Sequence, residues 1–115
     1  MSLRITDNQV NGVSVLALDG RVVFGEEAAT LREKVKGMID AGSKNLVLNV
    51  SNVTFIDSAG LGALVSAHHV TASSGGTLRL CNLGLKFKEM LHMTRMDKVF
   101  QISENEVDAV QSFSR

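Results

Sequence analysis

The sequence has 115 residues, of which 44% are hydrophobic, enough for one domain with a core of its own. Twelve basic and twelve acidic residues balance to zero net charge, and Trp and Tyr are absent. A nucleic-acid-binding protein would be expected to carry a basic excess and stacking aromatic residues, so that function is disfavoured. No apolar run reaches the roughly 18 residues of a membrane helix, and we expect a cytoplasmic protein without direct membrane insertion.

The chain contains no Pro, no low-complexity tract and no evident repeat. Residues 1–115 are therefore predicted to form a single domain. Part of the first three residues, MSL, is interpreted as a remnant of the expression vector. The only cysteine, Cys81, lies in the strand-like stretch LRLCNL. We expect it to be a small buried side chain rather than a reactive thiol.

The first predicted elements are a β-hairpin and a helix. In VSVLALDGRVVF, two β-rich runs flank Asp19-Gly20, a dipeptide that tolerates positive φ, so a hairpin turn is predicted there. From Glu26 to Ala41, apolar residues recur at helical spacing, and Gly42 follows as a stop signal. The apolar residues of this predicted helix are Leu31, Val35, Met38 and Ile39.

The rest of the chain alternates between strand and helix signals. The strand signals are residues 45–50 (NLVLNV), 77–83 (TLRLCNL) and 99–102 (VFQI). Between the strands, one helix is predicted up to Gly75-Gly76, and a second is predicted over residues 85–96. A terminal helix is predicted from near Glu104. The predicted apolar face is Leu61, Leu64, Val65 and His68 in the first of these helices, Phe87, Met90, Leu91 and Thr94 in the second, and Val107, Val110 and Phe113 in the terminal helix.

This alternation predicts an α/β fold with a small mixed β-sheet. Strands that alternate with helices form parallel pairs with right-handed crossovers, and the amino-terminal hairpin adds an antiparallel edge. Loops that leave the carboxyl ends of such strands are the usual functional edge. The stretch VTFIDSAGLGAL, residues 53–64, contains one of these loops and is the candidate site.

Cofactor and metal sites are not indicated. Gly60-x-Gly62 lacks the third glycine of a dinucleotide loop, because Val65 stands there, and GMIDAGSK reverses the Lys-Ser order of a P-loop. The three histidines, His68, His69 and His92, lack metal-ligand spacing. No cofactor and no metal are therefore expected, and His68 is interpreted as a core histidine.

A catalytic Ser58 is also disfavoured. Ile56 stands where a Gly-x-Ser-x-Gly elbow needs its first glycine. Asp57 is adjacent to the serine, His68 lies about three helical turns away, and only an unproven tertiary contact would bring His92 near. We therefore expect a non-enzymatic protein and keep a serine nucleophile only as a minor alternative.

Other features of this stretch suit a modified serine. Asp57 or Ser58 is predicted to cap the helix, but capping does not explain Gly60 and Gly62, each of which costs about 1 kcal/mol inside a helix. The two glycines indicate that a neighbouring element or an external partner passes close to the backbone. The start of a helix accommodates the charge of a phosphate, about −1.5 to −2, and the small residues leave the hydroxyl open to a kinase.

Four segments of the chain together resemble the STAS domain family. They are FIDSAGLGAL, the stretch LALDGRVV, the helix with LREKV, and LRLCNLGLKFKEMLHMTRMDKVF. Within that family the chain is similar to the bacterial anti-sigma factor antagonists, over roughly Leu3 to Val110. The resemblance implies that Ser58 is the phosphoacceptor, and that Ala59, in place of a second serine, leaves a single hydroxyl. It implies a partner-binding segment made of Asp57, Ser58, Ala59, Gly60, Leu61 and Gly62.

The resemblance also implies partners. The unphosphorylated form would bind an anti-sigma factor, a serine kinase of GHKL type, and thereby release a sigma factor. Phosphorylation would weaken that binding, and a metal-dependent serine phosphatase would restore it. The alternative is a STAS adaptor subunit of a membrane transport complex or larger signalling assembly, without obligatory phosphorylation.

One segment departs from the family pattern. Relatives often have an acidic residue after an apolar one where this chain has Val22-Val23-Phe24, followed by one extra residue before the first helix. This loop is expected to lie near Ser58.

Overall fold

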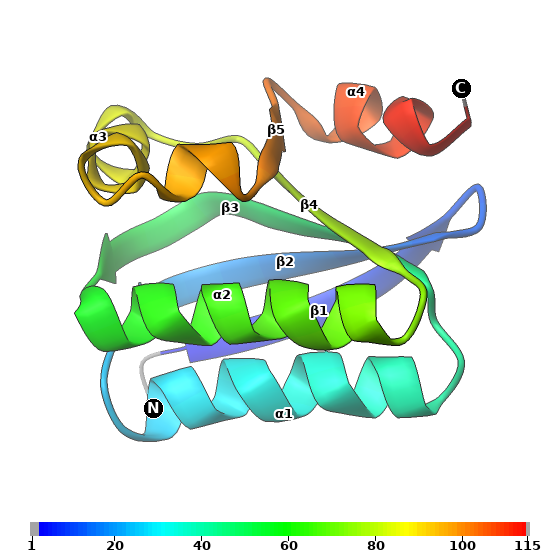
Figure 1. The fold of residues 1–115 in the computed structure, drawn as a ribbon, viewed down its shortest axis with the longest axis horizontal. Helices are drawn as coiled ribbons and strands as arrows, with labels where there is room; N and C mark the ends of the chain where they lie inside the picture. Colours follow the sequence, from blue (N-terminus) through cyan, green and yellow to red (C-terminus); the bar gives the residue numbers. More distant parts are fainter. Residues whose placement is uncertain (1–2, 115) are drawn as a thin grey trace.

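A computed structural model describes residues 3–114, and its centre is a five-stranded sheet in the order β1-β2-β3-β4-β5 (Figure 1). The first two strands are antiparallel, and each later neighbouring pair is parallel. The predicted small mixed sheet with an antiparallel edge is therefore confirmed. The strands are β1 (Leu3–Val10), β2 (Val13–Val22), β3 (Asn45–Ile56), β4 (Thr77–Cys81) and β5 (Gln101–Ser103).

The hairpin turn lies at Asn11-Gly12, so the predicted turn at Asp19-Gly20 is wrong. Asn11 and Gly12 have φ of 52° and 81°, the two positive values of a tight primed turn. Asp19 and Gly20 lie within β2, where the register against β3 shifts beside them. Both dipeptides tolerate positive φ, but a turn at Asn11-Gly12 lets all eight residues of β1 pair with β2.

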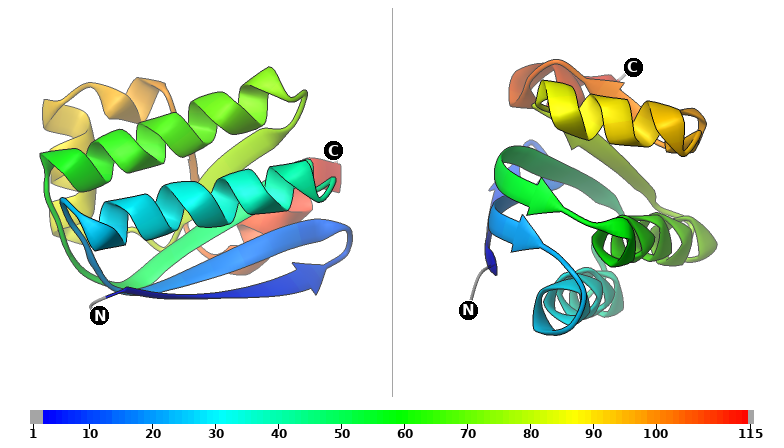
Figure 2. Two further views of the ribbon diagram at one scale, coloured as in Figure 1. Left: turned by 90° about the horizontal axis from the view of Figure 1, so that it is seen from below. Right: turned by 90° about the vertical axis from the view of Figure 1, so that its left-hand side faces the viewer.

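Helices α1 (Glu26–Asp40) and α2 (Ser58–Ser73) lie side by side on one face of the sheet (Figures 1 and 2). The predicted first helix is confirmed. Alternate strand residues point to this face, since side chains alternate along a strand. The larger core includes Leu16, Leu18, Leu31, Val35, Leu46, Leu48, Leu61, Leu64 and Leu80.

The opposite face is covered at one end by α4 (Glu106–Gln111), which runs into the 3₁₀ turn η2 (Ser112–Ser114). The predicted terminal helix is present, but its predicted apolar face is only partly right because Val107 is 62% exposed. Ala109 and Val110 make the contact with the sheet instead. They form a second cluster with Val13, Val15, Val47 and Cys81.

Cys81 is fully buried, as predicted. Burial, with a smaller contribution from the Glu106 charge, raises the pKa of its thiol to about 12. The thiolate that would react is therefore suppressed near neutral pH.

Helix α3 (Leu85–Met93) packs Phe87 and Leu91 into the larger core, as predicted. The predicted helix over residues 85–96 ends earlier, and Thr94 is an exposed C-cap rather than part of the buried stripe. Its hydroxyl donates to the Met90 carbonyl at 2.8 Å. The chain then turns into the 3₁₀ helix η1 (Met96–Lys98).

His68 lies on α2 at intermediate burial, with its ring edge-on to Phe100 at 5.4 Å between centroids. This contact places it against the larger core, as predicted, because Phe100 is buried there.

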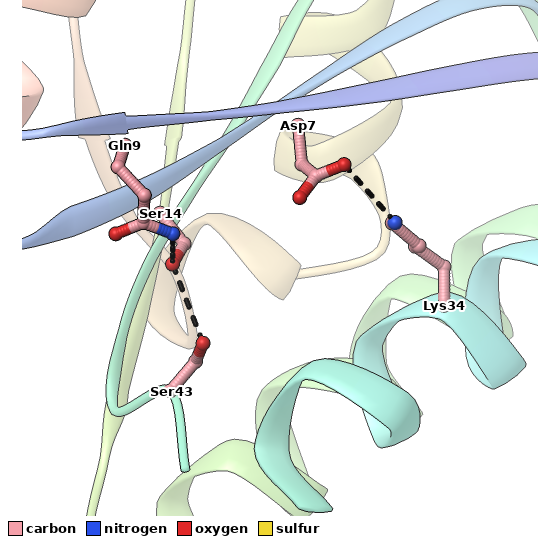
Figure 3. Close-up of polar contacts among 5 residues, drawn as sticks. All are labelled: Asp7, Gln9, Ser14, Lys34 and Ser43. Atoms are coloured by element: carbon pink, nitrogen blue, oxygen red, sulfur yellow. Dashed lines mark hydrogen bonds and ion pairs between the residues drawn. The ribbon is translucent and has the colours of Figure 1, made fainter. Parts of the chain in front are cut away.

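Polar contacts hold the first strand in place (Figure 3). Asp7 on β1 pairs with Lys34 on α1 at 3.2 Å. The buried hydroxyl of Ser14 accepts from Gln9 Nε2 at 2.6 Å and lies 3.4 Å from the hydroxyl of Ser43. Leu3 is itself part of the larger core, whereas Met1 and Ser2 of the suspected remnant lie outside the described residues.

Candidate functional site

Ser58 lies at the carboxyl end of β3, where the chain leaves the sheet and begins α2. β3 ends at Ile56, Asp57 is the N-cap, and Ser58 is the first helical residue. The Ser58 side chain is exposed, and within residues 3–114 its hydroxyl makes no hydrogen bond. The hydroxyl is thus open to solvent at the amino end of a 16-residue helix.

The capping role belongs to Asp57. Its Oδ1 accepts from the backbone N–H of Gly60 at 2.8 Å, and its Oδ2 accepts from the N–H of Phe24 at 3.0 Å. One carboxylate therefore joins the start of α2 to the loop between β2 and α1. The backbone N–H of Asp57 also donates to the Val22 carbonyl, at 3.3 Å.

These hydrogen bonds set the charge state of Asp57. The N–H groups of Gly60 and then Phe24 lower the pKa of the Asp57 carboxyl, against a smaller opposing effect of desolvation. The carboxylate is ionised at neutral pH, and a backbone N–H engages each of its oxygens. It is consequently a poor general base for the neighbouring serine.

Gly60 and Gly62 differ in how much space surrounds them. A Cβ on Gly60 would lie 1.9 Å from the Val22 carbonyl oxygen and 2.7 Å from its carbon, so the backbone of β2 occupies the space. A Cβ on Gly62 would meet nothing within 4 Å, and Gly62 is exposed. A neighbouring element thus explains Gly60, while only the outer surface borders Gly62.

The six predicted partner-binding residues fall into three groups by solvent exposure. Ser58 and Gly62 are exposed, and Asp57 and Ala59 are half-buried. Gly60 and Leu61 are buried, Leu61 with 7% of its surface exposed. Since Gly60 and Leu61 face the protein interior, any part they have in partner binding is to hold the exposed residues in position.

Phe24 is a site residue that the sequence did not single out for binding. Its side chain is 80% exposed, and its N–H bond to Asp57 places its backbone at the start of α2. Val23 before it is buried. The expected position of this loop near Ser58 is confirmed. The sequence signal that could have found Phe24 was an aromatic residue at the end of a β-rich run.

A known family matches almost the whole chain. The family model that matches describes a STAS domain and covers residues 4–109. The chain belongs to the STAS domain family. Among curated STAS relatives, the anti-sigma F factor antagonist of Paenibacillus polymyxa is 24% identical over 110 residues, 96% of this chain and 94% of that protein.

Two further relatives agree with this assignment. The anti-sigma-B factor antagonist of Bacillus subtilis is 30% identical over 84 residues, 73% of this chain and 76% of that protein. A crystal structure of a Thermotoga maritima protein described as an anti-sigma factor antagonist has a TM-score of 0.89 at 25% identity. That similarity covers 96% of this chain and 95% of the other, so the whole STAS fold is shared.

Metal-binding clusters and membrane-spanning helices are absent from the described part of this STAS domain. Residues 3–114 hold no group of three or more His, Cys, Asp or Glu side chains arranged to bind a metal ion. Over the same range, every helix is too short or too polar to span a bilayer.

Proposed function

We propose that this STAS protein is an anti-sigma factor antagonist, a regulatory binding module whose affinity for an anti-sigma factor is switched by phosphorylation of Ser58. The observation that carries the proposal is that two adjacent residues have different roles. Asp57 caps α2 and holds the loop, while the Ser58 hydroxyl is exposed and free of hydrogen bonds in the described chain. Modification of Ser58 therefore removes no contact that maintains the fold.

The surroundings of Ser58 suit a partner that distinguishes the two states. Phe24 offers a large exposed aromatic side chain, and Gly62 leaves the first turns of α2 open to close approach. Aromatic side chains at such positions often dominate binding energy. A phosphate on Ser58 would place about −1.5 to −2 charges in the surface that the partner must desolvate, which weakens association.

We also propose which enzymes add and remove the phosphate on Ser58. The anti-sigma factor would itself be the serine kinase, of GHKL type, and a serine phosphatase would regenerate the free hydroxyl. The alignment with two curated antagonists over most of the chain supports the antagonist role. Both oxygens of Asp57 accept backbone hydrogen bonds, which supports Ser58 as a substrate of another enzyme rather than a nucleophile.

The site assignment is tested by incubating the purified chain with a GHKL-type anti-sigma factor kinase of the same organism and ATP. Intact mass spectrometry is expected to show one added phosphate on the wild type and none on Ser58→Ala. Ser66→Ala, at a half-buried serine further along α2, is the matched control and should still accept one phosphate. Phosphate on Ser58→Ala would contradict the assignment.

A second variant separates switching from folding. Ser58→Asp is expected to lower affinity for the anti-sigma factor by about tenfold or more, measured by calorimetric titration. Its melting temperature should stay close to that of the wild type, because an acidic residue in the first turn of a helix is favourable. A collapse of the melting transition would show that Ser58 has a structural role.

A further inference from the structure

Strand β3 continues well beyond the end of its neighbour β4. The pairing of β3 with β4 stops at Asn49 opposite Cys81, whereas β3 runs on to Ile56 with β2 on its other side. From Val50 to Ile56, one edge of β3 therefore has no neighbouring strand within residues 3–114. Such an edge carries unpaired backbone donors and acceptors that can add another strand.

The edge is open because the chain turns away after β4. Asn82 has a left-handed φ of 62°, which ends the strand, and α3 begins three residues later at Leu85. The described chain has no backbone hydrogen bond to residues 50–56 on this side. The one side-chain hydrogen bond to the backbone of this stretch is donated by the Ser51 N–H to Asn49 Oδ1, at 3.0 Å, in the described residues.

A groove of about 560 Å³ lies between this edge and α3, which faces the end of β3 in both Figure 1 and Figure 2. Six residues of β3 between Val50 and Ile56 form one wall, and five residues between Gly84 and Met90 form the other. Phe55 is 57% exposed and Leu85 is 73% exposed at this groove. Large apolar side chains beside an open strand edge are typical of a surface that binds another chain.

The charge at the groove favours an acidic occupant. Lys86 is the one charged residue among those that line it. The amino end of α3 lies at the same place, with no acidic residue in its first turn and no side chain capping it. The helix dipole and the ammonium group thus both attract a carboxylate to this end.

We propose that the groove between residues 50–56 of β3 and α3 binds an extended peptide segment of a partner protein as an added β-strand. The peptide backbone would pair with the open edge of β3, and its apolar side chains would contact Phe55 and Leu85. A carboxylate of the peptide would lie near Lys86. Strand addition with side-chain pockets is a recurring mode of peptide recognition, and this proposal holds whether or not Ser58 is phosphorylated.

The occupant is tested with the full-length protein and a displayed library of random heptapeptides. We expect enrichment of peptides with alternating apolar residues and an acidic group, and the most enriched one is then synthesised with a fluorescent label. Leu85→Asp should weaken its binding by about tenfold or more in fluorescence anisotropy. Met93→Asp is the matched control, since Met93 is 81% exposed on the same helix but outside the groove, and it should leave affinity unchanged.

Two further arms test the chemistry of recognition. A peptide N-methylated at alternate backbone nitrogens should lose binding, because it cannot pair with a strand edge. Lys86→Glu should weaken binding, whereas Lys88→Glu, an exposed position outside the groove, should not. Comparing the free and amidated carboxyl terminus of the peptide identifies whether the bound carboxylate is terminal or belongs to a side chain.

Several results would overturn the proposal. One is a failure of the library to enrich any peptide that distinguishes wild type from Leu85→Asp. Another is equal binding of the N-methylated peptide, or its displacement by decanoate with the same dependence on Leu85, which would indicate a site for small amphiphiles. A dimer in size-exclusion chromatography that Leu85→Asp dissociates would instead assign the groove to a second copy of the chain.

Discussion

Gly60→Ala is expected to destabilise the protein by about 3 kcal/mol, measured by urea unfolding. The added methyl would lie 1.9 Å from the Val22 carbonyl oxygen, which belongs to the backbone of a central strand and cannot rotate away. Either α2 must move from the sheet, or β2 must shift and break its pairing with β3. Both movements disturb the larger core, because Val22 and Leu61 are part of it.

Gly62→Ala provides the matched control on the same helix. Its added methyl meets nothing within 4 Å, so the helix preference for alanine should stabilise the protein by about 0.5 to 1 kcal/mol. Equal effects of the two substitutions would contradict the close approach of Val22. If the proposed function is right, Gly62→Ala should nevertheless weaken binding of the anti-sigma factor, because it fills the surface open to the partner.

Asp57→Ala is expected to lower the melting temperature and to release the loop that carries Phe24. The variant removes the acceptors of two backbone N–H groups, Gly60 and Phe24, at once. Asp57→Asn should have a smaller effect on the melting temperature, since its remaining carbonyl oxygen can still cap α2 as Asn105 caps α4. Amide hydrogen exchange at Phe24 should accelerate in both variants.

The contribution of Asp57 should also depend on pH. Its pKa in the folded protein is below its ordinary value of 3.8, so its stabilising effect is fully present above about pH 3.8. That effect is lost as the pH falls through the lowered pKa. The difference in unfolding free energy between wild type and Asp57→Asn should therefore be constant near neutral pH and shrink in acid.

A carboxylate on the neighbouring helix serves as the control for the effect of Asp57 on stability. Asp40 forms an exposed ion pair with Lys36 on α1 at 3.1 Å, and such surface pairs contribute little. Asp40→Asn should change the melting temperature far less than Asp57→Asn at neutral pH. A constant difference between wild type and Asp57→Asn down to strongly acid pH would contradict the role of the two N–H bonds.

Local pattern was sufficient for the longer helices, but it did not indicate β1 (Leu3–Val10), and it ended the strand that begins at Asn45 before its last residue, Ile56. Apolar residues at helical spacing predicted α1 almost to its ends, since a helix must bury one face whatever its neighbours are. Pattern was less reliable in short helices, where Thr94 and Val107 were expected to be buried and are exposed. In a short or terminal helix, a small rotation changes which residues meet the core.

The hairpin turn shows why two equal local signals cannot be ranked without the sheet. Asn11-Gly12 and Asp19-Gly20 both suit positive φ, and both do have it at the glycine. Only the first allows β2 to remain continuous and to pair with β1 and β3 on its two edges. The second glycine instead lies where the register of β2 against β3 shifts.

The sequence by itself determined the α/β fold, the position of the DSAGLG stretch at a helix start and the resemblance to STAS domains, because these follow from periodicity and short motifs. Tertiary structure alone decided that Asp57 rather than Ser58 caps α2, that Val22 requires Gly60, and that the edge of β3 is left open beside α3. Each of these depends on segments far apart in the chain meeting in space. A carboxylate, a methyl group or a strand edge acquires its role from what lies within a few ångströms of it.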